Sequence, residues 1–478
     1  MTSFRLRPVF GVPGDDVTRP YLRLAEEDEL VRTTREDAAV YAAIGAAEVS
    51  GEPAAALATC GPGVAVALAG LACALADRVP VLCATGEITE RGFQSLVPSM
   101  ASDGVELTVT DDPEEAARTL ARSEPVLYVD PGFDPDGVSA ELEGIEPVEP
   151  DPEDVERVRG LLEGKRVAIL VGRGCYRARC GELVERLCEV LEAPIVETMR
   201  GRGVVPEYHP RNAGVVGLRG WANDMVEDAD VVLALGARLS GRTRADIDWP
   251  TTVAVGFGVE DADEVVECDV RAFVEALLED PPRTEPWNPE PGEPPEFDLE
   301  LYRVVKAALK AWIGPATVDS GQITPTALLA ARLSSPSELI HSGSFCPMGF
   351  AIPAALGASA RVPEMALALT GDGGFMVSCQ ELETAVREDL PIAVLVTRNG
   401  ELGFTRQVME EKEGRAAKMG LDADVLSIVE SLGAEVEVIE KPDPGEVKKV
   451  LRDVEMNGET TVVVVELPRE DVPMPGSG

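Results

Sequence analysis

The sequence is poor in histidine, in basic residues and in long apolar runs. Only 2 of its 478 residues are histidine, which nearly excludes a Ser-His-Asp triad or a histidine-rich metal centre. Its 43 Lys and Arg stand against 85 Asp and Glu, and the net charge of −42 repels nucleic acid and anionic membrane surfaces. Gly, Pro or charged residues interrupt the apolar stretches well below membrane-spanning length, and no basic-plus-apolar signal is visible at the start. We therefore expect a cytoplasmic protein that binds neither nucleic acid nor membrane.

The acidic residues are spread along the chain and do not form a tail. We interpret this as adaptation to a salty cytosol, where screening removes most of the self-repulsion. The nine cysteines include no Cys-x-x-Cys pair and mostly lie within apolar runs. They are typical of reduced core residues rather than of a disulfide framework or a zinc site.

Short β-branched runs alternate with Ala- and Leu-rich stretches along most of the chain, a pattern that predicts an α/β fold with parallel sheets. Two Pro- and Glu-rich seams, Gly144 to Asp154 and Asp280 to Phe297, interrupt it and are not expected to hold a helix or a central strand. We therefore predict three doubly wound parallel-sheet domains, at residues 1–145, 155–280 and 298–478.

The carboxy-terminal third contains a glycine-rich turn between a buried strand, Ala366 to Thr370, and a helix predicted from Phe375 to Val386. The turn reads Gly371-Asp372-Gly373-Gly374. Glycines at such a place let the backbone approach a phosphate, and the aspartate adds a carboxylate for a hard cation. The turn therefore predicts an anion and metal site.

A second strand, Ile392 to Thr397, ends just before Asn399, which lies 27 residues after Asp372. This spacing fits one helix and an adjacent parallel strand, so both side chains are expected at the same edge of the sheet. The Asp372 carboxylate, the Asn399 side-chain oxygen and the Glu401 backbone carbonyl, with diphosphate oxygens and water, would complete an octahedral Mg²⁺ shell.

These motifs resemble those of the thiamine diphosphate-dependent enzymes, in particular the large, catalytic subunit of acetolactate synthase. The family pattern is Gly-Asp-Gly followed at this spacing by Asn-Asn, and here Arg398 replaces the first Asn while Asn399 is kept. The resemblance implies thiamine diphosphate and Mg²⁺ as cofactors and pyrimidine-binding, central and diphosphate-binding domains in that order. The alternative for the motif alone is a generic glycine turn with a strand-capping asparagine.

Two further segments of the carboxy-terminal third resemble the family. His341 to Ala355 is similar to the segment that ends in Met-Gly-Phe-Gly-Leu-Pro-Ala-Ala, which implies that Gly343 contacts the cofactor and that Met348 holds its two rings in a bent arrangement. The alternative for Met348 is a side chain that fills core space. Asp319 to Gln322 resembles the Asp-Val-Gly-Gln turn and implies that Gln322 lies near the diphosphate.

The amino-terminal third supplies the catalytic acid by the same resemblance. Glu36, between the turn at Phe10 to Gly14 and the turn at Cys60 to Gly63, matches the glutamate that binds the pyrimidine ring and promotes removal of the thiazolium C2 proton. The alternative is an acid in the first turn of a helix, where the helix dipole favours it. Because the family pairs the pyrimidine domain of one subunit with the diphosphate domain of another, the resemblance implies a homodimer or homotetramer with active sites across subunits.

Resemblance is weaker where the substrate would bind. Ser240-Gly241-Arg242 keeps the arginine of the family's Asp-Asp-Arg, so Arg242 is a candidate for the substrate carboxylate, with an ordinary surface arginine as the alternative. Gln94 is retained, but Ser95 replaces the glutamate of Phe-Gln-Glu. The central third is shorter than in typical members, which argues against a bound FAD without excluding it.

The function favoured by the resemblance is decarboxylation of a 2-oxo acid followed by carboligation, as in the acetolactate synthases of branched-chain amino-acid biosynthesis. One alternative is a non-ligating decarboxylase of an anionic 2-oxo acid such as sulfopyruvate or phosphonopyruvate. The alternative from another class is a non-catalytic subunit with the same fold, against which the retention of Glu36, Asp372 and Asn399 argues.

Overall fold

The computed structural model describes residues 5–86, 101–102, 105–218, 220–244, 247–288 and 296–473. The chain forms two compact units. The first contains Met1–Ile145, Phe297–Ala331 and Leu339–Pro473, and the second contains Glu146–Glu296, Arg332–Glu338 and Met474–Gly478. Three six-stranded sheets, each with every strand pair parallel, confirm the predicted α/β class with three parallel-sheet blocks. Among the described residues no helix is long and apolar enough to cross a membrane.

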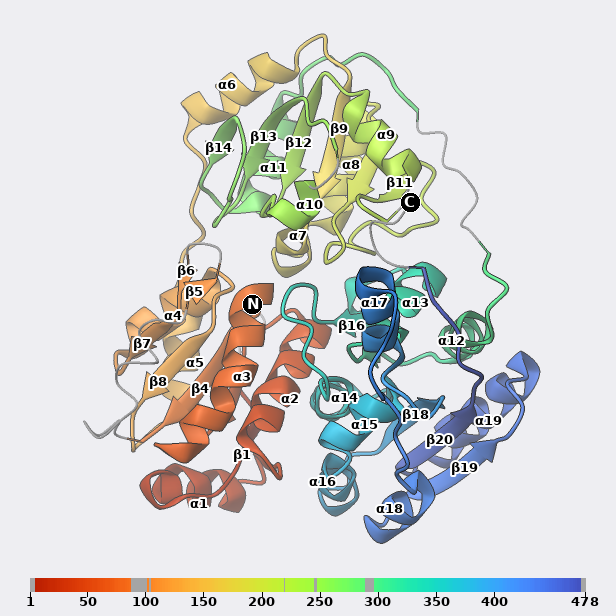
Figure 1. Cartoon of the computed structure of the whole chain (residues 1–478). Coiled ribbons are helices and arrows are strands. Elements are labelled where there is room, and N and C mark those ends of the chain that lie inside the picture. Colours follow the sequence, from red (N-terminus) through yellow and green to blue (C-terminus); the bar gives the residue numbers. More distant parts are fainter. Residues whose placement is uncertain are drawn as a thin grey trace. The chain divides into compact units, whose positions relative to one another are not determined.

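The amino-terminal sheet of the first unit has the strand order β2-β1-β3-β4-β8-β7 (Figure 1). A short antiparallel pair, β5 and β6, accompanies it. The elements are β1 (Val9–Gly11), α1 (Thr18–Glu26), β2 (Leu30–Arg32), α2 (Glu36–Ser50), β3 (Ala54–Leu57), α3 (Pro62–Asp77), β4 (Val81–Thr85), β5 (Ala101–Ser102), β6 (Val105–Glu106), β7 (Thr108–Thr110), α4 (Pro113–Ala121), β8 (Val126–Val129) and α5 (Pro135–Glu143).

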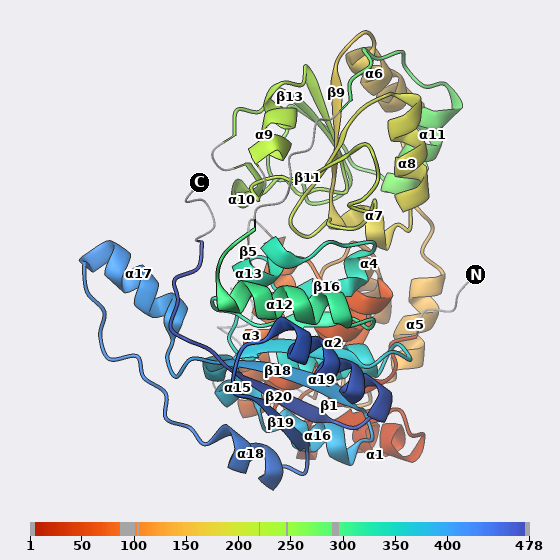
Figure 2. The ribbon, with the colours of Figure 1, turned by 90° about the vertical axis from the view of Figure 1, so that its right-hand side faces the viewer.

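The carboxy-terminal sheet of the same unit has the order β16-β15-β17-β18-β20-β19, the same chain plan as the amino-terminal sheet. Helices α14, α15 and α16 lie on one side of it, and α12, α13 and α19 on the other (Figures 1 and 2). The elements are α12 (Glu300–Ala311), β15 (Ala316–Val318), α13 (Ile323–Ala330), β16 (Leu339–His341), α14 (Ala351–Ser359), β17 (Ala366–Gly371), α15 (Asp372–Ser378), α16 (Glu381–Arg387), β18 (Ile392–Arg398), α17 (Gly403–Glu413), α18 (Val425–Ser431), β19 (Glu435–Ile439), α19 (Pro444–Asn457) and β20 (Thr461–Glu466).

The central sheet, in the second unit, has the different order β11-β10-β9-β12-β13-β14, which is the plan of dinucleotide-binding folds. The three blocks are thus two versions of one plan and one version of another. The elements are α6 (Pro152–Leu162), β9 (Val167–Val171), α7 (Arg173–Arg177), α8 (Gly181–Val190), β10 (Ile195–Glu197), β11 (Asn212–Val215), α9 (Gly220–Glu227), β12 (Val231–Leu235), α10 (Gly241–Arg244), β13 (Thr251–Val255), β14 (Glu264–Val266) and α11 (Val270–Glu279).

Two local predictions were wrong. The end of the first seam starts helix α6 because Asp151 caps it, accepting a hydrogen bond from the Glu153 N–H, and Pro152 is tolerated at the first helical position. The single helix predicted from Phe375 to Val386 is two helices, α15 and α16. Between them the N–H groups of Leu382 and Glu383 bond three residues back, to Cys379 and Gln380, so the α-helical ladder is broken there. All nine cysteines are free, and six are buried, as predicted.

Helices α2 and α14 join the two sheets of the first unit into one core (Figure 1). Their backbones approach so closely that a Cβ on Gly357 would lie 1.8 Å from the Ala42 carbonyl oxygen, and one on Gly45 would lie 2.0 Å from that of Ala354. No side chain larger than hydrogen fits at either glycine. Helix α2, which begins at Glu36, is therefore locked against the carboxy-terminal sheet of its own chain.

Candidate active site

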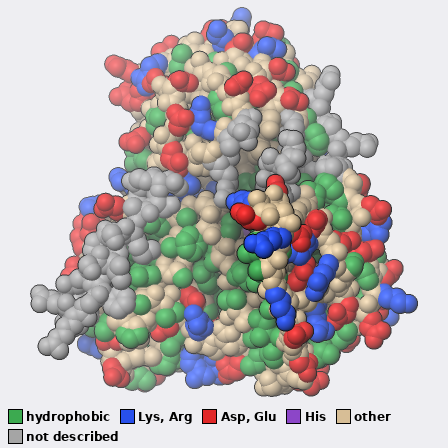
Figure 3. Space-filling model, in the orientation of Figure 1, with side chains coloured by type: hydrophobic (Ala, Val, Ile, Leu, Met, Phe, Trp, Pro, Cys, Tyr) green, Lys and Arg blue, Asp and Glu red, His purple; other side chains and the backbone are tan. Residues whose placement is uncertain are grey.

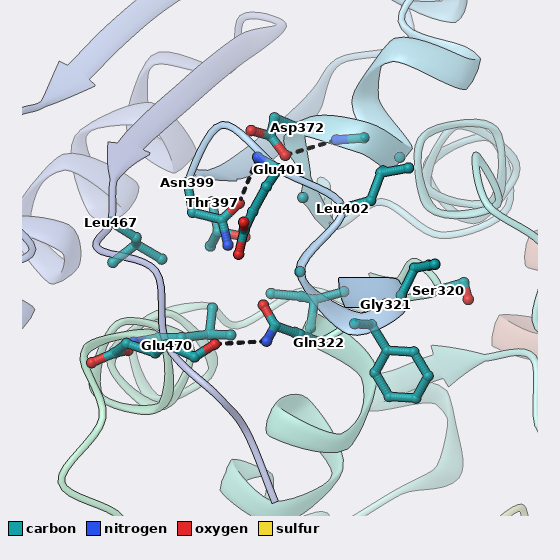
Figure 4. A pocket seen from close by; sticks show the side chains of 18 of the residues that line it. Ser320, Gly321, Gln322, Asp372, Thr397, Asn399, Glu401, Leu402, Leu467 and Glu470 are labelled. Atoms are coloured by element: carbon teal, nitrogen blue, oxygen red, sulfur yellow. Dashed lines mark hydrogen bonds between the residues drawn. The ribbon is translucent and has the colours of Figure 1, made fainter. Parts of the chain in front are cut away.

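A pocket opens at the carboxyl ends of β17 and β18, where Figure 4 shows Asp372 and Asn399, each directly after one of these strands, with Gln322 and Glu470 on another wall. Open parallel sheets bind ligands at this edge. The pocket is lined by Leu301, Ser320, Gly321, Gln322, Ile323, Met348, Gly371, Asp372, Gly373, Gly374, Thr397, Asn399, Glu401, Leu402, Gly403, Phe404, Thr405, Leu467, Pro468 and Glu470.

The glycine turn after β17 has the geometry expected of a cradle. A Cβ on Gly373 would lie 2.5 Å from Leu402 and 3.4 Å from Met348, and one on Gly374 would lie 2.5 Å from both Asp319 and Thr370. The Asp372 carboxylate accepts hydrogen bonds from the N–H groups of Gly373 (2.9 Å) and Gly400 (2.8 Å). A larger residue at either position would have to displace these side chains, so the tight turn requires glycine.

Asp372 is buried, and burial raises the pKa of its carboxyl group, whereas its backbone hydrogen bonds and the nearby positive charge of Arg398 lower it. Arg398, which replaces the first asparagine of the family motif, pairs with Glu466 on the adjacent strand at 2.7 Å. The Arg398 guanidinium, whose charge acts on Asp372, is thus itself paired with another carboxylate.

Asn399 and Glu401 follow β18 in a segment held by the loop at residues 419–421. Glu401 forms an isolated bridge with Gly420, and the Asn399 side-chain oxygen accepts from the Glu401 N–H at 3.2 Å. The Glu401 carboxylate is buried and bound to Arg406 at 2.9 Å and Arg469 at 3.3 Å. The Glu401 carboxylate is therefore engaged by two arginines, and the role of its backbone carbonyl at a metal stays a prediction.

These groups fit Mg²⁺ only in company with an anionic ligand. Among the described residues there is no cluster of three or more His, Cys, Asp or Glu side chains that could hold a metal ion. Asp372 and Asn399 offer one carboxylate and one amide oxygen, which are ligands Mg²⁺ accepts, but Mg²⁺ seeks six oxygens. The glycine cradle beside them leaves room for diphosphate oxygens to supply the remainder.

Asp319 organises the floor of the pocket, and the sequence reasoning did not single it out. Its fully buried carboxylate accepts hydrogen bonds from the N–H groups of Ser320 and Gly349 and from the Thr370 hydroxyl, each at 2.8 Å. Burial raises the pKa of Asp319 to about 6, against these hydrogen bonds, which lower it. One side chain thus ties together the segments that carry Gln322, Met348 and Asp372. The Asp-Val-Gly-Gln resemblance was the available signal.

Gln322 lies in the pocket wall, but its side chain is already bonded within the protein. Its amide nitrogen donates to the Glu470 carbonyl oxygen at 2.7 Å (Figure 4). Met348 also lines the pocket and is partly exposed. Gly343 does not belong to the described lining; its N–H donates to the Asp77 carboxylate at 3.0 Å, and Asp77 also accepts from the Ser342 hydroxyl at 2.6 Å.

Glu36 is the first residue of α2 and is half-buried, with its carboxylate beside Gly63, where a Cβ would lie 2.8 Å from Glu36 Oε1. It does not belong to the described lining of the pocket. Of the two substrate candidates, Gln94 lies outside the described residues, and Arg242 lies in α10 but its side chain is not described.

The three parallel sheets and the pocket at the carboxyl ends of β17 and β18 define an α/β protein with a candidate ligand site. Three models of one family match in order. They are the amino-terminal TPP-binding domain, the central domain and the carboxy-terminal TPP-binding domain of thiamine pyrophosphate enzymes, at residues 1–107, 156–277 and 319–465. They cover more than three quarters of the chain, which therefore belongs to the thiamine pyrophosphate-dependent enzymes.

Similar curated proteins are large subunits of acetolactate synthases. The chain is 27% identical to the probable acetolactate synthase large subunit of Methanocaldococcus jannaschii, across 98% of this chain and 90% of that one. It is 28% identical to the acetolactate synthase large subunit of Corynebacterium glutamicum, across 84% and 73%. Among solved structures, benzoylformate decarboxylase from Polynucleobacter necessarius shares the fold, with a TM-score of 0.78 at 18% identity over 98% of this chain and 96% of that one.

Proposed function

We propose that this enzyme decarboxylates a 2-oxo acid and joins the remaining carbon unit to a second carbonyl compound, as acetolactate synthase does in branched-chain amino-acid biosynthesis. The observation that carries the proposal is the pocket in which Asp372 and Asn399 lie beside the glycine cradle. The similarity to acetolactate synthase large subunits supports the reaction type. Thiamine diphosphate, when bound, supplies the nucleophilic carbon and the electron sink that decarboxylation needs.

The protein's own residues would hold and orient the reactants. Asp372, Asn399 and the Glu401 carbonyl would hold Mg²⁺ against the diphosphate. Met348 would support the bent arrangement of the cofactor rings from the pocket wall. Glu36 would hold a proton at the pyrimidine ring and so promote removal of the proton from the thiazolium carbon.

We further propose a homodimer or homotetramer whose active sites each combine two subunits. Glu36 does not belong to the described lining of the pocket in its own chain, and the family resemblance implies that the acid comes from a second chain. The surface beside the pocket carries the exposed apolar side chains Phe345, Met348, Met376 and Val377, with Val377 against Gly349 and Met348 against Gly373. Apolar side chains also gather over the face of the first unit drawn in Figure 3. Such a surface suits burial against another subunit.

Product analysis tests the reaction. Purified enzyme with pyruvate, thiamine diphosphate and Mg²⁺ is expected to release CO₂ and form acetolactate, and the Glu36→Gln variant is expected to form neither. Acetaldehyde without acetolactate would leave decarboxylation standing and reject carboligation. No turnover of pyruvate would reject the leading substrate and favour the second candidate, an anionic 2-oxo acid such as sulfopyruvate. That candidate rests on Arg242, which is retained without the acidic neighbours of the family motif.

We propose that the enzyme acts without FAD. After β9 and β12, the strands on either side of the switch point of the central sheet, two glycine turns approach each other closely. A Cβ on Gly172 would lie 2.2 Å from the Gly236 carbonyl oxygen, and the Gly174 N–H donates to that oxygen at 3.0 Å. The test is to add FAD, purify the protein again and record its absorption spectrum. Flavin absorption that stays with the protein would contradict the proposal. Free cysteines throughout also favour a reducing, cytoplasmic location.

A further inference from the structure

Helix α16 of the carboxy-terminal sheet holds the turn that precedes Glu36. The carboxylate of Glu381, its first residue, is fully buried and accepts from the Thr34 N–H at 3.2 and 3.3 Å, from the Thr34 hydroxyl and from the Thr384 hydroxyl at 2.8 Å. At the other end of α16, the Arg387 guanidinium donates to the Arg32 carbonyl oxygen at 2.7 Å. The helix therefore contacts the chain at the end of β2, through Arg32, and in the middle of the short segment before α2, through Thr34.

Local contacts also hold this segment: the Thr33 hydroxyl donates to the Arg35 carbonyl oxygen at 3.0 Å, and the Arg35 guanidinium pairs with Asp37 at 2.9 Å. Arg35, the residue before α2, has extended backbone and makes no side-chain capping hydrogen bond to the helix, although such caps stabilise many helix starts. Downstream, α2 is locked against α14 by the contacts at Gly45 and Gly357. Glu381 thus adds a long-range hold on the turn that leads into Glu36, two residues before the start of α2.

A carboxylate at position 381 is suited to holding the turn at Thr34 by hydrogen bonds, whereas an apolar side chain would only fill space. Burying a carboxylate is costly unless hydrogen bonds compensate. Burial does raise the pKa of Glu381, while the donors from Thr34 and Thr384 lower it. A carboxylate is an acceptor at both oxygens, so it satisfies all of these donors, whereas a glutamine would turn an NH₂ group toward one of them. An acid at this position thus fixes one arrangement of the turn.

We propose that Glu381 is a positioning residue for the proposed catalytic acid: it fixes the turn at Thr34 so that the Glu36 carboxylate points toward the pyrimidine ring of the cofactor. The inference rests on the proposed function of Glu36. In the proposed dimer, each acid is then aimed by the carboxy-terminal sheet of its own chain while it serves the pocket of the partner.

The test uses Glu381→Gln in the full-length holoenzyme, loaded with thiamine diphosphate and Mg²⁺ but without substrate. Hydrogen–deuterium exchange at the thiazolium C2 position, measured by NMR after acid quench, is expected to slow about tenfold or more, because a small misplacement of a catalytic group costs this much. Cofactor affinity, measured by calorimetry, is expected to stay within about twofold, since Glu381 is not part of the described pocket lining. Glu430→Gln, at an exposed position of α18 beside the same sheet, is the control and should exchange at the wild-type rate.

Thr34→Val and Thr34→Ser decide the matter if Glu381→Gln does not fold. Removing the hydroxyl donor should slow exchange, and serine, which keeps it, should restore the wild-type rate. Wild-type exchange in folded, cofactor-loaded Glu381→Gln or Thr34→Val would overturn the proposal. Glu36→Gln distinguishes failure of the proposed function from failure of the positioning role. If Glu36→Gln exchanges at the wild-type rate, the proposed role of Glu36 is wrong. If Glu36→Gln exchanges slowly while the Glu381 and Thr34 variants exchange at the wild-type rate, only the positioning role of Glu381 is wrong.

Discussion

Mixed dimers give the sharpest test of an active site shared between subunits. Glu36→Gln removes the acid and Asp372→Asn removes the metal carboxylate, so each variant alone should be inactive. In a dimer of one Glu36→Gln chain and one Asp372→Asn chain, one site carries both changes and the other carries neither. Random pairing makes half of the dimers mixed, and each has one intact site of two, so about one quarter of wild-type activity is expected.

The assay co-expresses the two variants with different affinity tags, isolates the mixed species by two purification steps and measures decarboxylation per dimer. The purified mixed dimer should reach about half of the wild-type rate, because one of its two sites is complete. Two tags on the same variant provide the control, which must remain inactive. A pure mixed dimer without activity would refute the shared site and would mean that Glu36 and Asp372 act within one chain.

Three further results are expected. Glu197 in the central domain is fully buried, and burial, with the charge of Glu207, raises its pKa from 4.5 to about 8. The pKa of Glu197 is higher in the folded protein than in the unfolded protein, so ionisation of Glu197 opposes folding. Glu197 therefore leaves the protein most stable at low pH, and that stability is lost as pH rises through about 8. Glu197→Gln should therefore gain roughly a few kcal/mol over wild type between pH 5 and 9 in denaturant titrations, and a pH-independent difference would contradict this. Gly357→Ala should destabilise the first unit by about 2–3 kcal/mol, because its Cβ would meet the Ala42 carbonyl oxygen, whereas Gly137→Ala, which meets nothing within 4 Å, should be neutral in thermal unfolding. Mg²⁺ binding followed by calorimetry should tighten about tenfold or more when thiamine diphosphate is present, and Asp372→Asn should remove that coupling.

The sequence predicted most accurately the strands and glycine turns next to the candidate site. The continuous apolar runs before Asp372 and Asn399 predicted strands from Ala366 and Ile392, and the structure begins β17 and β18 at those residues. The signals are local, since glycine turns and buried parallel strands are written in consecutive residues. The predicted pocket edge followed from topology alone, because neighbouring parallel strands end on the same side.

Contacts between distant segments were not predictable in the same way. Glu381 bonds Thr34 across 347 residues, and Asp77 bonds Ser342 across 265. In a chain with 85 acidic residues, no local feature distinguishes these acids from those on the surface. The hydrogen bonds that these acids make become recognisable only once the fold has brought the two sheets of the first unit together. The break in the helix before Glu381 was not predicted either. The spacing of apolar residues predicts a helix but does not show where one turn of its hydrogen bonds is lost.

Three acids of the first unit, Asp77, Asp319 and Glu381, perform a common physical task. The segments they hold are turns, whose N–H groups lack partners within a helix or sheet and cannot be left buried and unsatisfied. Asp319 accepts from such groups at Ser320 and Gly349, Asp77 accepts from Gly343, and Glu381 accepts from Thr34. Each carboxylate thereby fixes a loop that carries, or lies next to, a residue proposed to bind the cofactor or move its proton. The binding geometry is then held by charge-assisted hydrogen bonds that exist before any ligand arrives, so less of the binding energy has to be spent on ordering the loops.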